Sequence, residues 1–361
     1  MLRKLAAKDR RFVDTLARVR KPKVKRPVID GDRLLVTRGW APPGSTKFFD
    51  AGDLRALSLA DGSPVWEVTE EGTSGYEVGR LGEVIWWFGF FGEVTRLTRD
   101  GERLSRTELV TSSGKYDQFR SVQITPDAVV AATADSRLVW FADDGDISRT
   151  VELDGTAAWP AVAGGIVISG WNRWEGSACD GHFVGFDSQS GAQRWSVPAD
   201  GYAQAADVIG AYARLLNSEG EARVVEAATG EGRKWSGPAL GPILNSPTGP
   251  DEPIFALAKD PEVLVCLGPA PELSVRWQST RLGAPGTSVC VVDDTVLVLT
   301  GDGRLSALDA ADGSLGWQIS LGAAKFGSPP ESHVIGPGYL LGAPGQLVIA
   351  QGRSVAAYTL P

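Results

Sequence analysis

Short apolar runs alternate with polar turns along most of the chain, and one such unit recurs almost unchanged. Residues 304–317 read RLSALDAADGSLGW, residues 54–66 read LRALSLADGSPVW, and residues 182–195 read HFVGFDSQSGAQRW. A run that is apolar on both sides of a period-two pattern is typical of a strand covered on both faces. The Asp-Gly and Ser-Gly steps that follow favour a tight reversal. Each unit therefore predicts strand, turn and strand, with an indole placed to pack on the next unit.

The shared positions of the units are a glycine in the turn and a tryptophan that opens the return strand. They are Gly62, Gly191, Gly230 and Gly313, with Trp66, Trp195, Trp235, Trp277 and Trp317. The copy that ends at Trp235 is looser, because the tryptophan stands five positions after its glycine rather than four. Weaker copies bring the number of pre-turn strands to eight, about 40 to 50 residues apart. A period in the forties with several short strands in each unit predicts the blades of a β-propeller.

We therefore expect an all-β chain that forms an eight-bladed β-propeller of four-stranded antiparallel blades, with seven blades as the alternative. The chain ends on QLVIAQGRSVAAYTLP, which supplies two strands without a return strand. A segment between Phe12 and Arg26 is expected to close the ring. Residues 1–27 then form a basic leader, predicted as a helix or a ring-closing strand, and residues 28–361 form a single propeller domain. The other interpretation of the leader is a tail that docks on an acidic surface.

One repeat carries a specific resemblance. The form Gly-x-Leu-x-Ala-Leu-Asp-Ala-x-x-Gly-x-x-x-Trp at Gly303–Trp317 resembles the repeat of the pyrroloquinoline-quinone-type β-propellers. That family includes quinoprotein alcohol dehydrogenases and also cofactor-free scaffold proteins. The resemblance implies, for an enzyme, a disulfide between adjacent cysteines, calcium ligands and a catalytic aspartate, whereas the cysteines here stand at 179, 266 and 290. The chain is more similar to the scaffold members, so we predict no catalytic residue, cofactor or metal site.

Charge and composition narrow the function further. The leader holds eleven Lys or Arg against two Asp, and the rest of the chain holds 25 Lys or Arg against 42 Asp or Glu. An acidic ring does not favour nucleic acid, because phosphate contacts need clustered positive charge. No segment approaches the roughly 20 apolar residues of a membrane helix. The leader lacks the apolar core of a secretory signal, so we expect a cytoplasmic protein.

Two of the predicted blades contain a longer connection than the others. Residues 38–53 and 169–181 intervene between the second strand and the pre-turn strand of their units, and equivalent loops of a propeller emerge on one face. That face is predicted to gather a set of aromatic side chains with an arginine: Trp40, Phe48, Phe49, Phe90, Phe91, Trp171, Arg173 and Trp174. This composition is typical of protein interfaces.

We therefore expect a non-catalytic binding platform that recruits a protein partner through this face. Two alternatives stay open at this point. The rings could fold down as plugs of the central channel, or the channel mouth could hold a small ligand, as in a quinone- or sugar-dependent enzyme.

Overall fold

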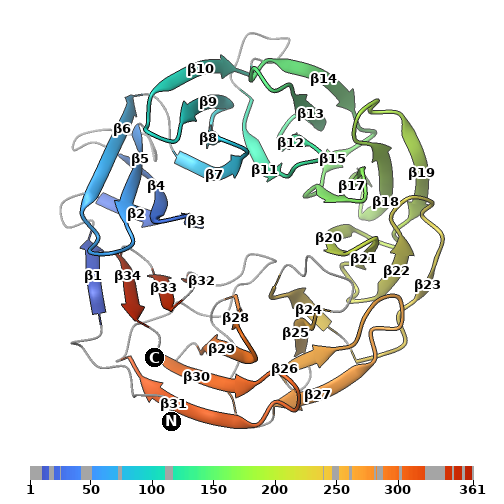
Figure 1. The fold of residues 1–361 in the computed structure, drawn as a ribbon. Helices are drawn as coiled ribbons and strands as arrows, with labels where there is room; N and C mark the ends of the chain where they lie inside the picture. Colours follow the sequence, from blue (N-terminus) through green and yellow to red (C-terminus); the bar gives the residue numbers. More distant parts are fainter. Residues whose placement is uncertain are drawn as a thin grey trace.

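The computed structural model shows eight β-sheets arranged around a central axis (Figure 1). It describes residues 10–15, 20–24, 26–41, 51–71, 75–109, 117–238, 240–245, 252–259, 262–279, 282, 288–300, 303–321, 338–343, 345–351 and 354–359. All the elements in these ranges are strands or turns. The prediction of an all-β propeller with eight blades, rather than seven, is confirmed.

The first four blades follow one another along the chain. Blade 1 contains β2 (Arg20–Val24), β3 (Val28–Asp30), β4 (Arg33–Ala41), β5 (Ala51–Ser58) and β6 (Pro64–Glu71); blade 2 contains β7 (Gly75–Leu81), β8 (Val84–Gly89), β9 (Glu93–Thr98) and β10 (Arg103–Glu108). Blade 3 contains β11 (Phe119–Ile124), β12 (Val129–Thr133), β13 (Arg137–Phe141) and β14 (Ile147–Glu152). Blade 4 contains β15 (Thr156–Ala157), β16 (Ala161–Ala163), β17 (Ile166–Glu175), β18 (Ala178–Asp187) and β19 (Gln193–Pro198).

The remaining blades repeat the pattern. Blade 5 contains β20 (Ala203–Ile209), β21 (Tyr212–Asn217), β22 (Ala222–Glu226) and β23 (Gly232–Lys234); blade 6 contains β24 (Leu240–Ile243), β25 (Ile254–Lys259), β26 (Glu262–Leu267) and β27 (Val275–Ser279). Blade 7 contains β28 (Cys290–Val292), β29 (Thr295–Leu299), β30 (Arg304–Asp309) and β31 (Leu315–Ser320). Blade 8 contains β32 (Gly338–Ala343), β33 (Gln346–Gln351), β34 (Ser354–Thr359) and β1 (Arg10–Thr15).

The last blade is closed by the other end of the chain. Strand β1 pairs antiparallel with β34, with Phe12 opposite Ala357 and Asp14 opposite Val355. The predicted ring-closing strand is thus present, and it begins slightly before the expected segment. Strands from both ends of the chain pair in this one blade, which completes it and closes the ring. The predicted docking role of the leader is not tested by this pairing.

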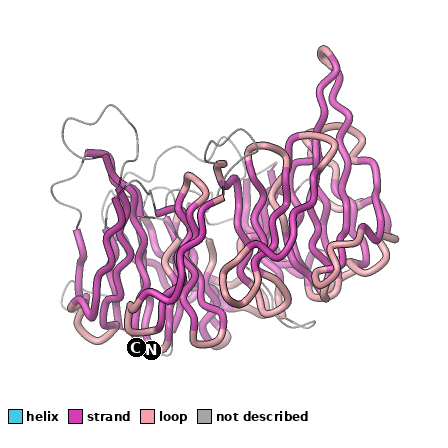
Figure 2. Tube along the Cα trace, turned by 90° about the horizontal axis from the view of Figure 1, so that it is seen from above, coloured by secondary structure: helices cyan, strands magenta, loops and turns pink. Residues whose placement is uncertain are grey.

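Antiparallel order gives the ring two distinct faces. In each blade the first strand lies at the channel and the fourth at the outer edge, as Figure 1 shows for β7 and β10. The turns between third and fourth strands, which carry the Asp-Gly steps, lie on one face, which we call the turn face. The connections between second and third strands lie on the opposite face, which we call the loop face. In Figure 2 both chain ends lie at the turn face.

The hydrophobic core is divided among the seams between blades. Eight clusters of buried side chains are present, one between each pair of neighbouring blades. At the closing seam, Leu34 and Val36 of blade 1 pack with Val348 and Ala350 of blade 8, all four at most 1% exposed. Both faces of each sheet are therefore buried, which explains the apolar runs in the sequence.

Three seams share one further contact, which we call the indole clamp. The repeat tryptophan of one blade donates its Nε1–H to a backbone oxygen in the turn between the third and fourth strands of the next blade. The pairs are Trp66 to Arg99 O (2.9 Å), Trp195 to Ala227 O (2.8 Å) and Trp277 to Ala310 O (3.0 Å). The indole also lies against the turn glycine: a Cβ on Gly230 would come within 2.6 Å of Trp195, and one on Gly313 within 2.6 Å of Trp277.

Other seams use different side chains at the same place. Ser105 donates to Asp144 O at 2.9 Å, and Arg149 donates to Gln189 O at 2.6 Å. In blade 5 the ladder between β22 and β23 lacks the register shift found in the outer ladders of the other blades, so Arg233 occupies the clamp position. Arg233 reaches Glu272 of blade 6 at 3.4 Å.

The two remaining repeat tryptophans make no clamp bond: Trp317 occupies the clamp register opposite Ala307, but its Nε1–H meets no acceptor among the described residues. Trp235 lies two positions beyond the clamp position of its strand and donates to Pro238 O at 2.9 Å. Without the bulge the clamp position comes three residues after Gly230, at Arg233, so Trp235 lies on the same strand face two residues further on. Trp317 packs against the cluster between blades 7 and 8.

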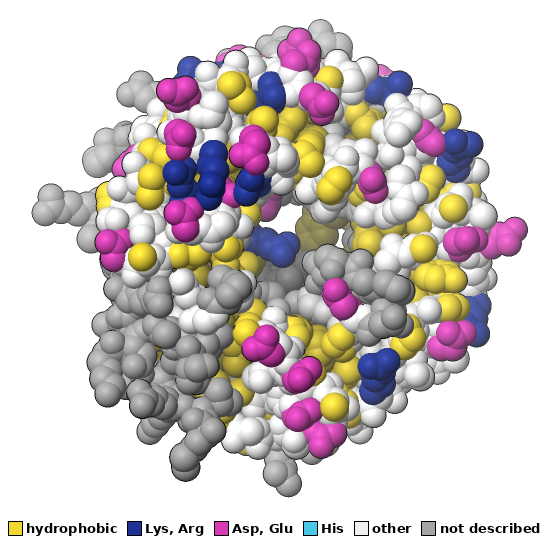
Figure 3. Space-filling model, viewed as in Figure 1, with side chains coloured by type: hydrophobic (Ala, Val, Ile, Leu, Met, Phe, Trp, Pro, Cys, Tyr) yellow, Lys and Arg dark blue, Asp and Glu magenta, His cyan; other side chains and the backbone are white. Residues whose placement is uncertain are grey.

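An ion-pair network spans the seam between blades 1 and 2 at the turn face. The buried carboxylate of Asp30 contacts Arg80 and Arg99, the latter at 3.3 Å, and Arg99 also reaches Asp32 at 2.8 Å. Arg33 pairs with Asp100 at 3.1 Å. Figure 3, which views the turn face, shows basic side chains gathered among acidic ones beside the central opening. Because each of these arginines is paired, the network joins the two blades rather than offering free positive charge.

Candidate functional site

The loop face is dominated by one hairpin of blade 4. Strands β17 and β18 pair over ten positions, from Ile166 opposite Asp187 to Glu175 opposite Ala178, and turn at Gly176 with a φ of 65°. Figure 2 shows a hairpin projecting beyond the rest of the ring on the face opposite the chain ends. The sequence predicted an irregular loop at 169–181, and the structure continues both strands through it instead. In the same way β4 and β5 extend into the predicted loop 38–53, pairing as far as Trp40 opposite Ala51.

The base of the hairpin is fixed to blade 5 by one amide. The Asn172 side chain is 1% exposed; its Nδ2 donates to Ala203 O at 3.0 Å and its Oδ1 accepts from Ala203 N at 2.7 Å. A Cβ on Gly181 would lie 2.1 Å from Gly201 O, so the two segments approach as closely as only glycine permits. This anchoring explains why polar residues continue as strands here.

Two of the predicted site residues pack into the hairpin itself. Trp171 is 7% exposed and stacks on His182 with ring centroids 4.6 Å apart and planes within 9°. Arg173 lies 6.0 Å from the Trp171 ring and pairs with Asp180 at 3.1 Å. The histidine also lies 3.3 Å from an Asp180 oxygen. Trp171 therefore stiffens the hairpin and presents little surface to a partner.

Trp174, in contrast to Trp171, faces solvent. It is 58% exposed, the largest exposure of any large apolar side chain in the described part of the chain. Its one described ring neighbour is Tyr202, with centroids 6.2 Å apart and planes inclined by 34°. An exposed indole on a rigid ribbon is the kind of group that anchors a protein interface.

The other predicted aromatic residues do not join this group. Phe90 and Phe91 lie on the loop face at blade 2, edge to face with centroids 5.3 Å apart, and blade 3 separates them from the hairpin. Trp40 lies on β4, but its side chain is outside the described residues, and Phe48 and Phe49 also lie outside them. The described members of the predicted set thus form two separate groups.

A charged cluster on the loop face of blade 3 was not predicted. Asp117, 2% exposed, accepts from Arg137 at 2.8 Å, and Arg137 also reaches Asp135 at 2.7 Å. Burial, together with the neighbouring Asp135, raises the pKa of the Asp117 carboxyl. Asp135 and Arg137 lie two residues apart at one turn, but Asp117 comes from the segment before β11, so the sequence spacing does not indicate the buried member. Since the one arginine bridges both carboxylates, the cluster orders the connection rather than exposing a reactive pair.

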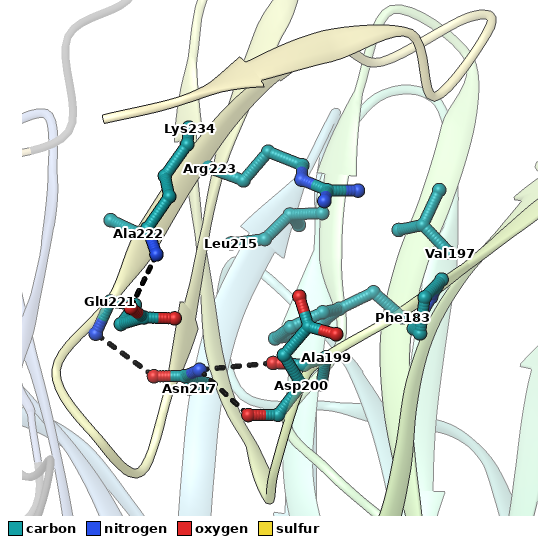
Figure 4. Close-up of a pocket in the computed structure, with 11 residues that line it drawn as sticks. Phe183, Val197, Ala199, Asp200, Leu215, Asn217, Glu221, Ala222, Arg223 and Lys234 are labelled. Atoms are coloured by element: carbon teal, nitrogen blue, oxygen red, sulfur yellow. Dashed lines mark hydrogen bonds and ion pairs between the residues drawn. The ribbon is translucent and has the colours of Figure 1, made fainter. Parts of the chain in front are cut away.

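A small pocket opens between blades 4 and 5 (Figure 4). Its apolar wall includes Phe183, Val197 and Leu215. Its lower rim is fixed by Asn217, whose Nδ2 donates to Ala199 O at 3.0 Å and to Asp200 O at 3.2 Å, while its Oδ1 accepts from Glu221 N at 2.9 Å. One buried amide therefore joins the connection between the blades to the loop of blade 5, and the pocket is preformed.

The charged groups of this pocket come from neighbouring strands. Arg223 on β22 lies directly opposite Lys234 on β23, and Lys234 pairs with Glu221. In Figure 4 the Arg223 guanidinium reaches over the pocket toward Val197, with the Asp200 carboxylate below it. No hydrogen bond or ion pair joins Arg223 to another described residue. The sequence did not indicate this site, because residues 222–235 follow the repeat pattern and carry no other motif.

The central channel holds a larger cavity of about 490 Å³. It is lined by the innermost strands of blades 8, 1, 2 and 3, and its polar side chains include Glu77, Gln123 and Tyr339. Burial, with the nearby Glu77 carboxylate, raises the pKa of Tyr339. Among the described residues no group of three His, Cys, Asp or Glu is arranged to hold a metal ion. Nor does the described part of the chain contain a helix long and apolar enough to span a membrane.

The fold and its contacts define the class of the protein as an eight-bladed β-propeller. Residues 209–336, about a third of the chain, match the family model described as outer membrane protein assembly factor BamB. This match and the shared fold support a propeller of the pyrroloquinoline-quinone-type repeat family, as the repeats predicted. No curated protein matches the chain.

Two solved structures show the same fold. The computationally designed Ika8 protein has a TM-score of 0.66 at 15% identity, covering 96% of this chain and 98% of its own. BamB from Moraxella catarrhalis has a TM-score of 0.59 at 16% identity, with the same coverage of both chains. At these identities the likeness establishes the architecture, and function has to be argued from the site.

Proposed function

We propose that this protein is a non-catalytic binding platform whose loop face recruits a protein partner. The observation that carries the proposal is Trp174, 58% exposed on a hairpin that is stiffened by stacking at its base. An exposed indole is unfavourable in water. Its burial against a partner would stabilise the complex by roughly 25 cal/mol for each Å² of apolar surface removed from water. A rigid ribbon also loses little entropy on binding. The hairpin is thus a preorganised anchor.

Two further considerations support a platform. The matching family is described as an assembly factor, and assembly requires contact with other proteins. The clamp contacts fill the turn face with repeated, internally satisfied groups, which leaves the loop face as the place where the blades differ from one another. We also propose a cytoplasmic location, and a basic leader that docks on an acidic surface, from the sequence composition.

The proposal is tested by photo-crosslinking in the native cell. The photoreactive residue p-benzoylphenylalanine replaces Trp174 in one variant and Leu315, an exposed apolar residue of the turn face, in a control. We expect the variant at 174 to give a discrete crosslinked species, identified by mass spectrometry, that the variant at 315 does not give. Equal crosslinking at both positions, or none at position 174, would contradict recruitment through this face.

A small-ligand site in the channel is the second candidate, because the cavity of about 490 Å³ lies within the range of ligand pockets. Incubation with pyrroloquinoline quinone and calcium, followed by dye reduction with alcohols and sugars, tests it. Turnover above a control without quinone would favour an enzyme.

A further inference from the structure

The pocket between blades 4 and 5 combines a preformed shape with one cation that pairs with no described residue, the Arg223 guanidinium, among two acidic and two basic lining residues. Its volume of about 30 Å³ matches a single small group, such as a carboxylate, rather than a whole ligand molecule. Its rim is held by the three hydrogen bonds of Asn217, so an entering group meets a fixed frame. A site that needs no rearrangement binds at a lower entropic cost.

The charges of the pocket favour an incoming anion. Arg223 and Lys234 lie directly opposite each other on paired strands, and like charges at such positions repel. Glu221 neutralises Lys234. Arg223, which is half-buried, keeps its guanidinium donors without an acceptor among the described side chains. Asp200 is exposed, so water hydrates its carboxylate. The half-buried Arg223 guanidinium is therefore the group that lacks hydrogen-bond partners within the described part of the chain.

The same connection places the pocket beside the aromatic anchor. Asp200 lines the pocket, and Tyr202, two residues later, is the ring neighbour of Trp174. Two residues of extended chain span at most about 7 Å. An acidic group in the pocket and an apolar group on Trp174 would therefore belong to one short segment of a partner.

We propose that the seam between blades 4 and 5 binds a peptide segment in which an Asp or Glu carboxylate pairs with Arg223 while a nearby apolar side chain packs on Trp174. The carboxylate fits the planar fork of a guanidinium, which can donate two parallel hydrogen bonds. The apolar walls of the pocket exclude water around this pair and strengthen it. The inference rests on the proposed function and names the chemistry of the partner.

The test uses the full chain and a random dodecapeptide library displayed on phage. Enriched peptides are synthesised, and their affinity for the wild-type chain, Arg223→Glu and Trp174→Ala is measured by fluorescence anisotropy. We expect enriched peptides to carry an acidic residue close to an aliphatic or aromatic one. Arg223→Glu is expected to weaken binding by about 10- to 100-fold, since a charge-assisted pair becomes a repulsion.

Arg194→Glu is the matched control, because it makes the same charge change at an exposed site on the turn face. It should bind like wild type, and a peptide with its acid changed to lysine should recover affinity for Arg223→Glu. If Arg223→Glu melts early, Arg223→Gln replaces it, with an expected loss of about tenfold. The inference is overturned when no peptide is enriched, when the enriched peptides lack an acid, or when Arg223→Glu equals Arg194→Glu. Crosslinking from position 174 would still report a partner in those cases, so the two failures are distinguishable.

Discussion

The turn face and the loop face of this ring differ in how their side chains are used. On the turn face, Trp66, Trp195 and Trp277 make one contact at three seams, each indole donating to a backbone oxygen of the next blade. On the loop face no such indole contact joins the described blades, and a similar indole, Trp174, faces solvent. The difference teaches that an indole at the clamp position holds the ring together, whereas Trp174, outside the repeat and exposed, is available for another molecule.

Replacing one indole on each face should separate these roles most clearly. Trp195→Ala removes a side chain 8% exposed, together with its hydrogen bond to Ala227 O, and should lower the free energy of unfolding by about 3–5 kcal/mol. Trp174→Ala, on the loop face, should change it by less than about 0.5 kcal/mol. Both values come from denaturant unfolding followed by tryptophan fluorescence and circular dichroism. A comparable loss in Trp174→Ala would mean that the exposed indole is structural.

A smaller effect is expected at the glycines beneath the indoles. Gly313 has a φ of 72° and a Cβ there would lie 2.6 Å from Trp277, whereas Gly210 has a φ of 59° with open space around it. Gly210→Ala should cost about 1 kcal/mol, for the left-handed backbone alone. Gly313→Ala should cost about 2–3 kcal/mol, because the indole must also move. Both losses are measured by thermal or denaturant unfolding. Equal losses in Gly210→Ala and Gly313→Ala would show that the Trp277 indole can move without cost.

The seams without an indole should be weaker still. Arg149→Ala removes a hydrogen bond to Gln189 O of 2.6 Å and the stem that lies against Gly191. We expect a loss of about 1 kcal/mol, as for an ordinary hydrogen bond with some packing. The free energy of unfolding of Arg149→Ala is measured in parallel with that of Trp195→Ala. A larger loss in Arg149→Ala would show that the arginine contact stabilises its seam more than the indole does.

The sequence predicted the ring because its periodic part is set by local physics. A turn glycine and an indole four residues later give the same geometry in every unit with that spacing, as at Gly191 and Trp195. The position of Trp235 could not be predicted from the sequence. It depends on the absence of a β-bulge between β22 and β23, which is a property of strand pairing and not of any single residue. The spacing of five between Gly230 and Trp235 showed only that this unit departs from the others.

The candidate site was harder to predict for the same reason. Residues 169–181 contain Gly, Ser and Asn, which favour loops, yet Asn172 binds the backbone of Ala203 and keeps the segment extended. The pocket draws Asn217 and Arg223 from blade 5 and Val197 from blade 4, so it exists only after two units are packed. Trp171 and Trp174 look alike in sequence, and their strand register alone buries the first and exposes the second.

The smallest expected effect concerns the turn-face aspartates. Asp312 accepts a hydrogen bond from Ser314 N at 2.8 Å, and this bond, with one from the serine hydroxyl, lowers the pKa of its carboxyl from the ordinary 3.8. A carboxyl with a lower pKa in the folded chain adds stability above its unfolded pKa, and loses it as pH falls through the folded value. Asp312→Asn should therefore lower the Tm by about 1–2 °C at pH 7 and by less at each step below about pH 4.

Thermal melts of both proteins from pH 7 to pH 2.5 measure this difference. Asp143→Asn is the matched control, since Asp143 is an exposed aspartate of a turn-face turn whose carboxylate bonds to no described residue. Its Tm should follow wild type at every pH. Curves of wild type and Asp312→Asn that stay parallel into acid would show that the turn depends on the shape of the side chain and not on its charge. The turn at Asp312 would then be held by hydrogen-bond geometry, and its contrast with the charged pocket of the loop face would become sharper.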